Sequence, residues 1–376
     1  MNKKIKIGII SVDINTPMFN YGAILHTWAF EKYLEMEGFS NYENIDYLPD
    51  ILKYQNRLFP IIDLITNTHK RISFRYSLHY FQYLKKYIRI NKFCRNKMVN
   101  SKIQYKYGTI GKKELDYDVL IAEDDVIWAP GFLCRKDFVD KTFFLAHENM
   151  KDCKKISYSA SMAECNFDPK DYQKLKEYLS DFDKISVRES YAKDFIEREL
   201  HLPATKVLDA VFLLEAKDYA PIISDRFLDM KNYLLMYLPA DDNIELREAA
   251  KKYAKKNNLV IIEVSNKICS SKGIYGDCGV EDFLSAIKYA SVIFTNSFHA
   301  ICFAILFEKE FYAFSRKSGG KIKDICDAFD VSYRYFPDKY VESIDMINYS
   351  NVNSTVQRLS NESRKWLLDS LEEVSK

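Results

Sequence analysis

Residues 291–307 combine a short apolar strand, a polar turn and an apolar helix, and this pattern strongly constrains the fold. The first five residues are uncharged and include β-branched and aromatic side chains, as expected of a central strand in a parallel sheet. Residues 300–307 are almost wholly apolar, which predicts a buried helix. A strand that ends at a helix N-terminus favours anions, because the first N–H groups and the helix dipole both attract negative charge. The sequence therefore predicts an α/β protein with an anion site at this turn.

Two polar residues at the turn are candidate site residues. Ser297 supplies an oxygen that can cap the helix or bind a substrate. His299 lies in the first turn of the predicted helix, and a side chain that titrates near neutral pH can act as an acid or a base. A core histidine beside an ordinary helix cap explains the same residues equally well.

The length of 376 residues exceeds what one hydrophobic core usually serves, so two domains are expected. One series of strands and helices ends near residue 220, and a second begins near residue 231. We predict Rossmann-like domains over residues 1–220 and 231–345 that face each other across a cleft. A polar amphipathic helix over 354–376 is predicted to follow them.

The first predicted helix begins at a second candidate site. Asn20 and Gly22 stand at its start, after a strand at residues 5–11, but Gly-x-Gly-x-x-Gly is absent, so there is no dinucleotide fingerprint. Gly22 can let the backbone approach a ligand closely. A plain turn glycine is an equally good interpretation.

Cations follow two other predicted strands. Arg188 lies near the end of the strand predicted at residues 184–189, and its guanidinium group suits phosphate and carboxylate, although a structural pair with Glu189 is the alternative. A glycine-rich loop after residues 311–314 could gather N–H groups and cations around a phosphate, or it could be a solvated turn. Its candidate phosphate ligands are Arg316, Lys317 and Lys321.

Four motifs in this order resemble the polysaccharide pyruvyl transferase family. They are Asn20-Tyr21-Gly22 before an Ala-Ile-Leu helix, Asp125 with Trp128, the segment Ser186-Val187-Arg188-Glu189, and Thr295-Asn-Ser-Phe-His-Ala300. The second motif departs from the family pattern, because Glu123 and Asp124 replace small residues. The resemblance implies a GT-B-type fold whose C-terminal helix crosses back to the first domain.

The resemblance also implies a reaction. A pyruvyl group would move from phosphoenolpyruvate to a sugar hydroxyl in cell-surface polysaccharide or glycan biosynthesis, with no cofactor besides this donor substrate. His299 would be the acid or base, Arg188 would hold the donor, and Asp125 would activate the acceptor. Two alternatives stay open: a GT-B glycosyltransferase that uses a nucleotide sugar, and a non-catalytic glycan-binding relative, which the unusual Glu123 and Asp124 favour.

Residues 53–113 are strongly basic and aromatic, with 15 Lys or Arg side chains and eleven Tyr or Phe against one acid, Asp63. An amphipathic basic helix over 72–98 is predicted within them. It could be a solvated face, a membrane-surface element or a nucleic-acid patch. The aromatic residues and the absence of any nucleic-acid-binding motif favour an anionic membrane over nucleic acid, so we expect no nucleic-acid partner, and a solvated face stays an equal alternative.

The remaining signals concern location and metal. Eight scattered cysteines without Cys-x-x-Cys predict reduced thiols, and no apolar run approaches the roughly 18 residues that span a bilayer. We therefore expect a cytoplasmic protein, with a lipid-linked acceptor placing it at the inner face of the plasma membrane. No group of His, Cys and carboxylates has ligand spacing in the sequence, so we expect no metal and activity that survives EDTA.

Overall fold

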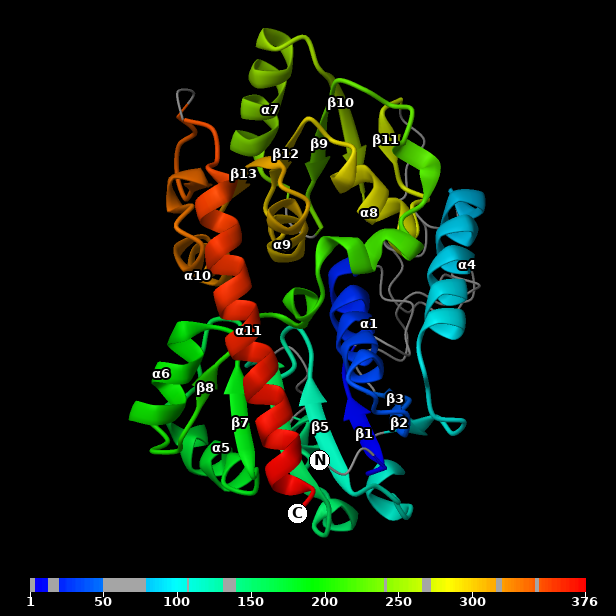
Figure 1. The fold of residues 1–376 in the computed structure, drawn as a ribbon, viewed down its shortest axis with the longest axis vertical. Coiled ribbons are helices and arrows are strands. Elements are labelled where there is room, and N and C mark those ends of the chain that lie inside the picture. Colours follow the sequence, from blue (N-terminus) through cyan, green and yellow to red (C-terminus); the bar gives the residue numbers. More distant parts are fainter. Residues whose placement is uncertain are drawn as a thin grey trace.

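A computed structural model describes residues 4–12, 20–49, 79–106, 108–130, 140–239, 242–265, 272–315, 320–341 and 345–376. Two six-stranded parallel sheets lie at opposite ends of the molecule, with helices around and between them (Figure 1). The predicted α/β class with two Rossmann-like sheets is therefore confirmed.

The first sheet is built from residues before 210 and has the order β2-β1-β5-β6-β7-β8. Its strands are β1 Ile7–Ile10, β2 Tyr42–Asn44, β5 Val119–Glu123, β6 Lys154–Ala160, β7 Lys184–Val187 and β8 Thr205–Lys206. The strand order reverses direction between β1 and β5, and open α/β sheets bind ligands beyond the carboxyl ends of strands at such a point. A separate parallel pair joins β3 Tyr47–Leu48 to β4 Tyr105–Lys106.

The second sheet has the order β11-β10-β9-β12-β13-β14. Its strands are β9 Tyr233–Tyr237, β10 Val260–Val264, β11 Ile274–Tyr275, β12 Val292–Thr295, β13 Glu310–Phe314 and β14 Tyr335–Phe336. The order reverses between β9 and β12, so the polar turn after β12 stands at the switch point of this sheet. The strand predicted at 291–295 is thus central and fully buried over Val292–Thr295.

The helices are α1 Tyr21–Met36, α4 Tyr80–Lys97, α5 Tyr172–Leu179, α6 Ser190–Arg198, α7 Ile244–Lys256, α8 Val280–Lys288, α9 Phe298–Leu306, α10 Gly320–Ala328 and α11 Tyr349–Val374. Short 3-10 helices are η1 Ile110–Lys112, η2 Lys141–Phe144, η3 Glu148–Met150, η4 Pro169–Asp171, η5 Ala210–Leu213, η6 Ala216–Ile222, η7 Asp225–Phe227 and η8 Ser332–Arg334. No helix among these described segments is both long and apolar enough to span a bilayer.

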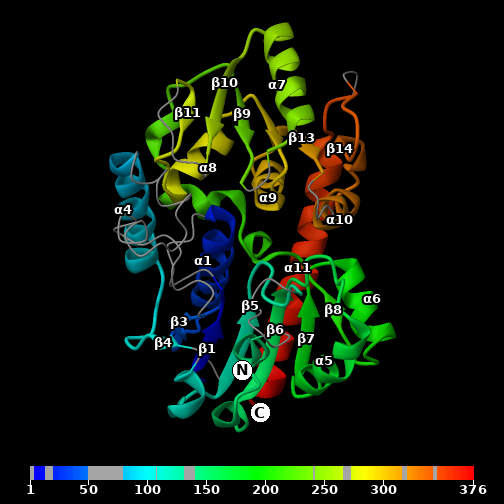
Figure 2. The same cartoon turned by 180° about the vertical axis from the view of Figure 1, so that it is seen from behind.

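α11 runs from the second sheet back to the first, as the family resemblance implied (Figures 1 and 2). At its start, the hydroxyl of Tyr349 donates to the carbonyl oxygen of Ala304 in the second domain, 3.3 Å away. Further along, the hydroxyl of Ser363 accepts from Leu208 N–H at 2.9 Å, in the first domain. One helix therefore holds both halves.

α1 belongs to the first domain but packs against the second. The ring of Tyr21 stacks on Phe283 of α8, with the centroids 5.0 Å apart, and its hydroxyl donates to the carbonyl oxygen of Cys278 at 2.9 Å. One continuous cluster of buried apolar side chains includes both domains. The predicted cleft is consequently closed by packed side chains along this helix.

α4 corrects part of the prediction for the basic insert. Residues 50–78 lie outside the described residues, but the helix predicted over 72–98 is present at Tyr80–Lys97. Lys86 is fully buried, and its Nζ donates to the carbonyl oxygen of Ser265 at 3.1 Å. Arg89 pairs with Asp282 of α8 at 2.6 Å. These two cations therefore hold α4 on the second domain, and the buried Lys86 is not part of a solvated or membrane-facing surface.

Candidate active site

Asp209, between β8 and η5, is the centre of a buried polar cluster. Its Oδ2 lies 2.9 Å from Nη1 of Arg188, 3.0 Å from Nδ1 of His26 and 3.4 Å from Nε2 of His299. The same carboxylate accepts from Val211 N–H at 3.1 Å through its other oxygen. Three of the clustered side chains come from the first domain, and His299 comes from α9 of the second. The predicted residues Arg188 and His299 are thus brought together.

Arg188 has a carboxylate against each part of its guanidinium group. Nη2 donates to Asp125 at 2.6 Å and Nε donates to Glu189 at 3.0 Å, in addition to the bond with Asp209. Burial lowers the pKa of Arg188, but these three carboxylates raise it by more, to well above its usual range. The guanidinium group also lies over the ring of Phe298, 4.2 Å from the centroid. Arg188 is a fixed cation at the N-terminus of α9.

Asp125, which follows β5, is held by two cations. Its Oδ1 accepts from Nζ of Lys321 at 2.9 Å as well as from Arg188. Burial raises the pKa of Asp125, but Lys321 and Arg188 lower it by more, to well below its usual range. A carboxylate with so low a pKa is a weak base, so the geometry disfavours Asp125 as the group that deprotonates an acceptor. It instead links Lys321 of α10 to the first domain.

The two acids that depart from the family pattern have structural partners. Glu123 Oε2 lies 2.8 Å from Nε2 of His26, and both side chains are fully buried. Asp124 has φ +149°, in a backbone region that favours glycine, and its carboxylate accepts from Val12 N–H at 2.8 Å. The extra charge at 123 is therefore matched by a histidine on α1.

His26 is the site residue that sequence reasoning missed. Burial lowers its pKa, but Asp209 and Glu123 raise it by more, to well above the ordinary histidine value. The imidazole is therefore protonated near neutral pH and bridges the two carboxylates. One signal could have found it, because a buried acid such as Glu123 requires a nearby cation.

His299 is also buried, but its pKa shifts the other way. Burial lowers the pKa of His299, and the attraction of Asp209 does not fully offset it. The ring is therefore neutral near pH 7 and can accept a proton. The cluster thus holds one protonated imidazole, on α1, and one neutral imidazole, on α9.

Two of the other predicted substrate-binding residues, Asn20 and Ser297, act as helix caps. The side chain of Asn20 caps α1 by accepting from Ala23 N–H at 3.5 Å, and Ser297 caps α9 by accepting from Ala300 N–H at 3.3 Å. Arg316 and Lys317 lie outside the described residues. The anion site at the start of α9 stays a prediction.

Gly22 packs closely against His299, and its approach to a ligand stays a prediction. A Cβ at this position would lie 2.2 Å from Nδ1 of His299. α1 thus approaches His299 so closely that no side chain fits between them.

Replacing Gly22 with alanine is expected to displace the imidazole of His299. Overpacking costs about 1–3 kcal/mol of unfolding free energy, against a gain of roughly 1 kcal/mol in helix propensity, so we expect a lower melting temperature and reduced activity. Gly108→Ala is the matched control, because a Cβ there meets nothing within 4 Å. Equal melting temperatures and activities for the two variants would show that α1 adjusts without disturbing His299.

Three side chains of the cluster are of types that can bind a metal ion. His26, Asp209 and His299 each offer a ligand atom, and these atoms lie within 4.8 Å of one another, so folding creates a spacing that the sequence did not reveal. However, the guanidinium group of Arg188 donates to the same Asp209 oxygen, and a cation in that position opposes a metal ion. The absence of metal stays a prediction.

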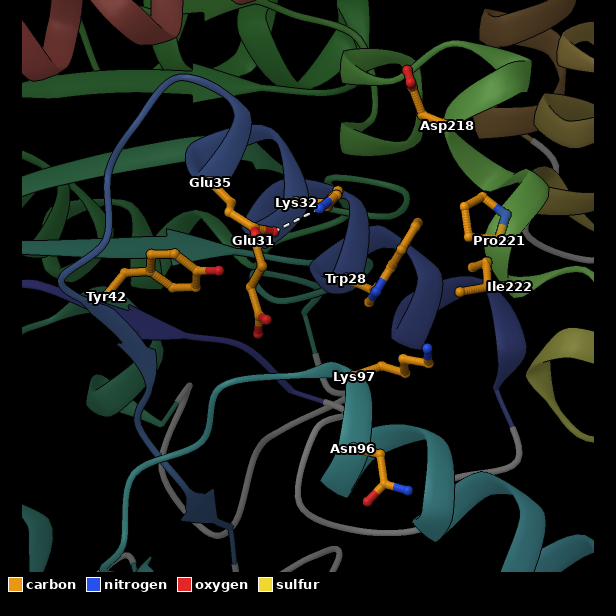
Figure 3. Close-up of a pocket in the computed structure, with 10 residues that line it drawn as sticks. All are labelled: Trp28, Glu31, Lys32, Glu35, Tyr42, Asn96, Lys97, Asp218, Pro221 and Ile222. Atoms are coloured by element: carbon orange, nitrogen blue, oxygen red, sulfur yellow. Dashed lines mark hydrogen bonds and ion pairs between the residues drawn. The ribbon is translucent and has the colours of Figure 1, made fainter.

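A separate pocket of about 270 Å³ lies further along α1, between α4 and η6 (Figure 3). Trp28, Pro221 and Ile222 line one part of it, and the Lys32–Glu35 ion pair lies at its edge. The carboxylate of Glu31 accepts from Asn44 and from Val99 N–H, and burial raises its pKa to about 8. The residues that line this pocket do not include Arg188 or His299, so the Asp209 cluster, which contains both predicted site residues, is the better candidate for chemistry.

Two parallel Rossmann-like sheets, joined by a crossing C-terminal helix and meeting at a charged cluster, define a protein of the GT-B type. The UDP-N-acetylglucosamine 2-epimerase of Methanocaldococcus jannaschii, in complex with UDP-GlcNAc and UDP, has a similar structure, with a TM-score of 0.52 and 13% identity over 98% of this chain and 99% of that one. The corresponding enzyme of Rickettsia bellii gives 0.48 and 12% over 99% and 97%. At 13% identity, the first of these likenesses shows the fold alone.

The sequence pattern of the polysaccharide pyruvyl transferase family matches residues 20–318. The chain belongs to this family. No curated protein sequence was found to match it. The matched range includes His26, Asp125, Arg188, Asp209 and His299. Lys321 lies just beyond its end.

Proposed function

We propose that the protein transfers a pyruvyl group from phosphoenolpyruvate to a saccharide hydroxyl. The observation that carries the proposal is a neutral imidazole next to two cations at a helix N-terminus. Arg188 and Lys321 approach the ring of Phe298, with their charged groups 4.2 and 6.0 Å from its centroid, and Phe298 is the first residue of α9. Phosphate and carboxylate groups are the ligands that such a combination favours.

Donor binding requires an exchange of partners. Arg188 and Lys321 are both bound to Asp125, so an incoming phosphate or carboxylate would replace that carboxylate at one of them. The remaining bonds of Arg188 to Glu189 and Asp209 would keep the guanidinium group oriented. Arg188 would thus position the donor while staying anchored.

His299 supplies the proton transfers in this proposal. When an acceptor hydroxyl adds to phosphoenolpyruvate, the hydroxyl loses a proton, the methylene carbon gains one, and a C–O bond forms at the adjacent carbon. A neutral imidazole can accept the first proton and supply the second. A neighbouring hydroxyl then adds to that carbon as phosphate leaves with the remaining proton, which gives a ketal.

Product analysis tests the reaction. The protein is incubated with phosphoenolpyruvate and a panel of free, nucleotide-linked and lipid-linked saccharides, and released phosphate and acceptor masses are measured. We expect phosphate release that depends on an acceptor, and a product heavier by one pyruvyl group. Nucleoside diphosphate release from a nucleotide sugar, without use of phosphoenolpyruvate, would instead identify a glycosyltransferase. Failure to bind either donor in calorimetry would identify a non-catalytic relative.

A further inference from the structure

α4 has two chemically different faces. The helix carries Lys or Arg at six positions and no acid. On the inner face, Lys86 bonds to Ser265 and also lies 4.7 Å from the ring centroid of Tyr21. Arg89 shares Asp282 with Arg226, at 2.6 and 3.0 Å. The inner cations thus already have partners within the protein.

The outer stripe of α4 consists of Phe81, Lys85, Ile88, Lys92 and Arg95. Spacings of four, three, four and three residues place these side chains along one side of a helix. All five are exposed, and the exposed fractions of the two apolar ones, Phe81 and Ile88, are 80% and 53%. α4 lies at the outer edge of the molecule in both ribbon views (Figures 1 and 2).

The three outer cations have little compensation within the protein. No ion pair joins Lys85, Lys92 or Arg95 to an acid among the described residues, although Lys92 is near enough to Glu281 to lower the pKa of that carboxyl slightly against the effect of burial. The stripe therefore presents positive charge and apolar surface together.

We propose that the outer stripe of α4 docks the protein on an anionic lipid surface. Cations attract anionic headgroups, while Phe81 and Ile88 gain free energy by leaving water for the headgroup boundary. A nucleic acid would match the charge, but its backbone offers no apolar layer for an isoleucine side chain. Docking through this stripe leaves the inner contacts of Lys86 and Arg89 in place, so attachment does not open the contact between the domains.

The test is co-sedimentation of the full chain with vesicles of phosphatidylcholine alone and of phosphatidylcholine with phosphatidylglycerol, at low and high salt. We expect binding to the anionic vesicles only, weakened by salt. Lys85→Gln with Lys92→Gln should lower the partition coefficient roughly 30-fold, and Phe81→Ser with Ile88→Ser should lower it at both salt concentrations. The readout needs no substrate, so it is independent of the proposed reaction.

Lys251→Gln with Lys255→Gln on α7 is the matched control, because these lysines are also exposed and the charge change is the same. This variant should sediment like the wild type. The proposal is overturned if the wild type stays in the supernatant with anionic vesicles at low salt, or if the α4 and α7 variants lose binding equally. It is also overturned if the chain binds duplex or single-stranded DNA but no vesicle. Thermal melts should show that all variants are folded.

Discussion

Replacing His299 by alanine is expected to reduce pyruvyl transfer at least about a hundredfold, because an acid or base group contributes roughly 10² to 10⁴ to the rate. The imidazole is 4% exposed, and its partner Asp209 is also held by Arg188 and His26, so the variant should remain folded. Added imidazole should restore part of the activity by occupying the space that the side chain leaves. Turnover near the wild-type level in a folded variant would show that His299 is not the proton carrier.

The pH dependence of kcat/KM is a second test of the role of His299. A base must be deprotonated to act, so kcat/KM should fall as the pH drops through the pKa of His299. Because burial holds that pKa below the ordinary histidine value of about 6.5, the acid limb should lie below pH 6.5. His299→Ala should lack this limb. An acid limb above pH 7 would assign the titration to another group.

Replacing Arg188 by alanine is expected to harm both stability and activity. The variant would leave Asp125, Glu189 and Asp209 buried without their shared cation. Breaking a buried pair in this way costs about 3–5 kcal/mol of unfolding free energy. We also expect transfer to fall at least about a hundredfold, since the donor would lose its main cation. Denaturant unfolding and kcat/KM for phosphoenolpyruvate measure the two effects.

Two matched variants separate these effects. Arg188→Lys keeps the charge but cannot reach three carboxylates with a planar fork, so it should be intermediate in stability and weak in activity. Arg198→Ala removes an arginine that is 76% exposed and 3.7 Å from Asp194, and exposed pairs contribute at most about 1 kcal/mol. It should match the wild type. If Arg188→Ala behaves like Arg198→Ala, the buried network does not have the role assigned to it.

The sheets were predictable because each strand is a short apolar run that ends at a polar turn. The strand at 292–295 and its helix appear where the pattern placed them, and Asn20 begins the first helix. Local sequence determines these features, because apolar periodicity and helix capping each involve residues that are only a few positions apart.

The charged network could not be predicted in this way. His26, Asp209 and His299 are separated by 183 and 90 residues and meet because α1, the residue before η5 and α9 pack together. The inner face of α4 was misread for a similar reason, because the partners of Lys86 and Arg89, Ser265 and Asp282, lie in the other domain. Composition indicates that a segment is basic, but it does not indicate which of its cations are already neutralised.

The division of the cluster between the two halves has a consequence for the timing of the catalytic cycle. His299 and Lys321 belong to the second half, while their partners Asp209 and Asp125 belong to the first. A motion that separated the halves would break both pairs, while Arg188 would stay bound to both carboxylates in the first half. Under the proposed reaction, the proton carrier would therefore reach its place beside Arg188 only when the halves are closed.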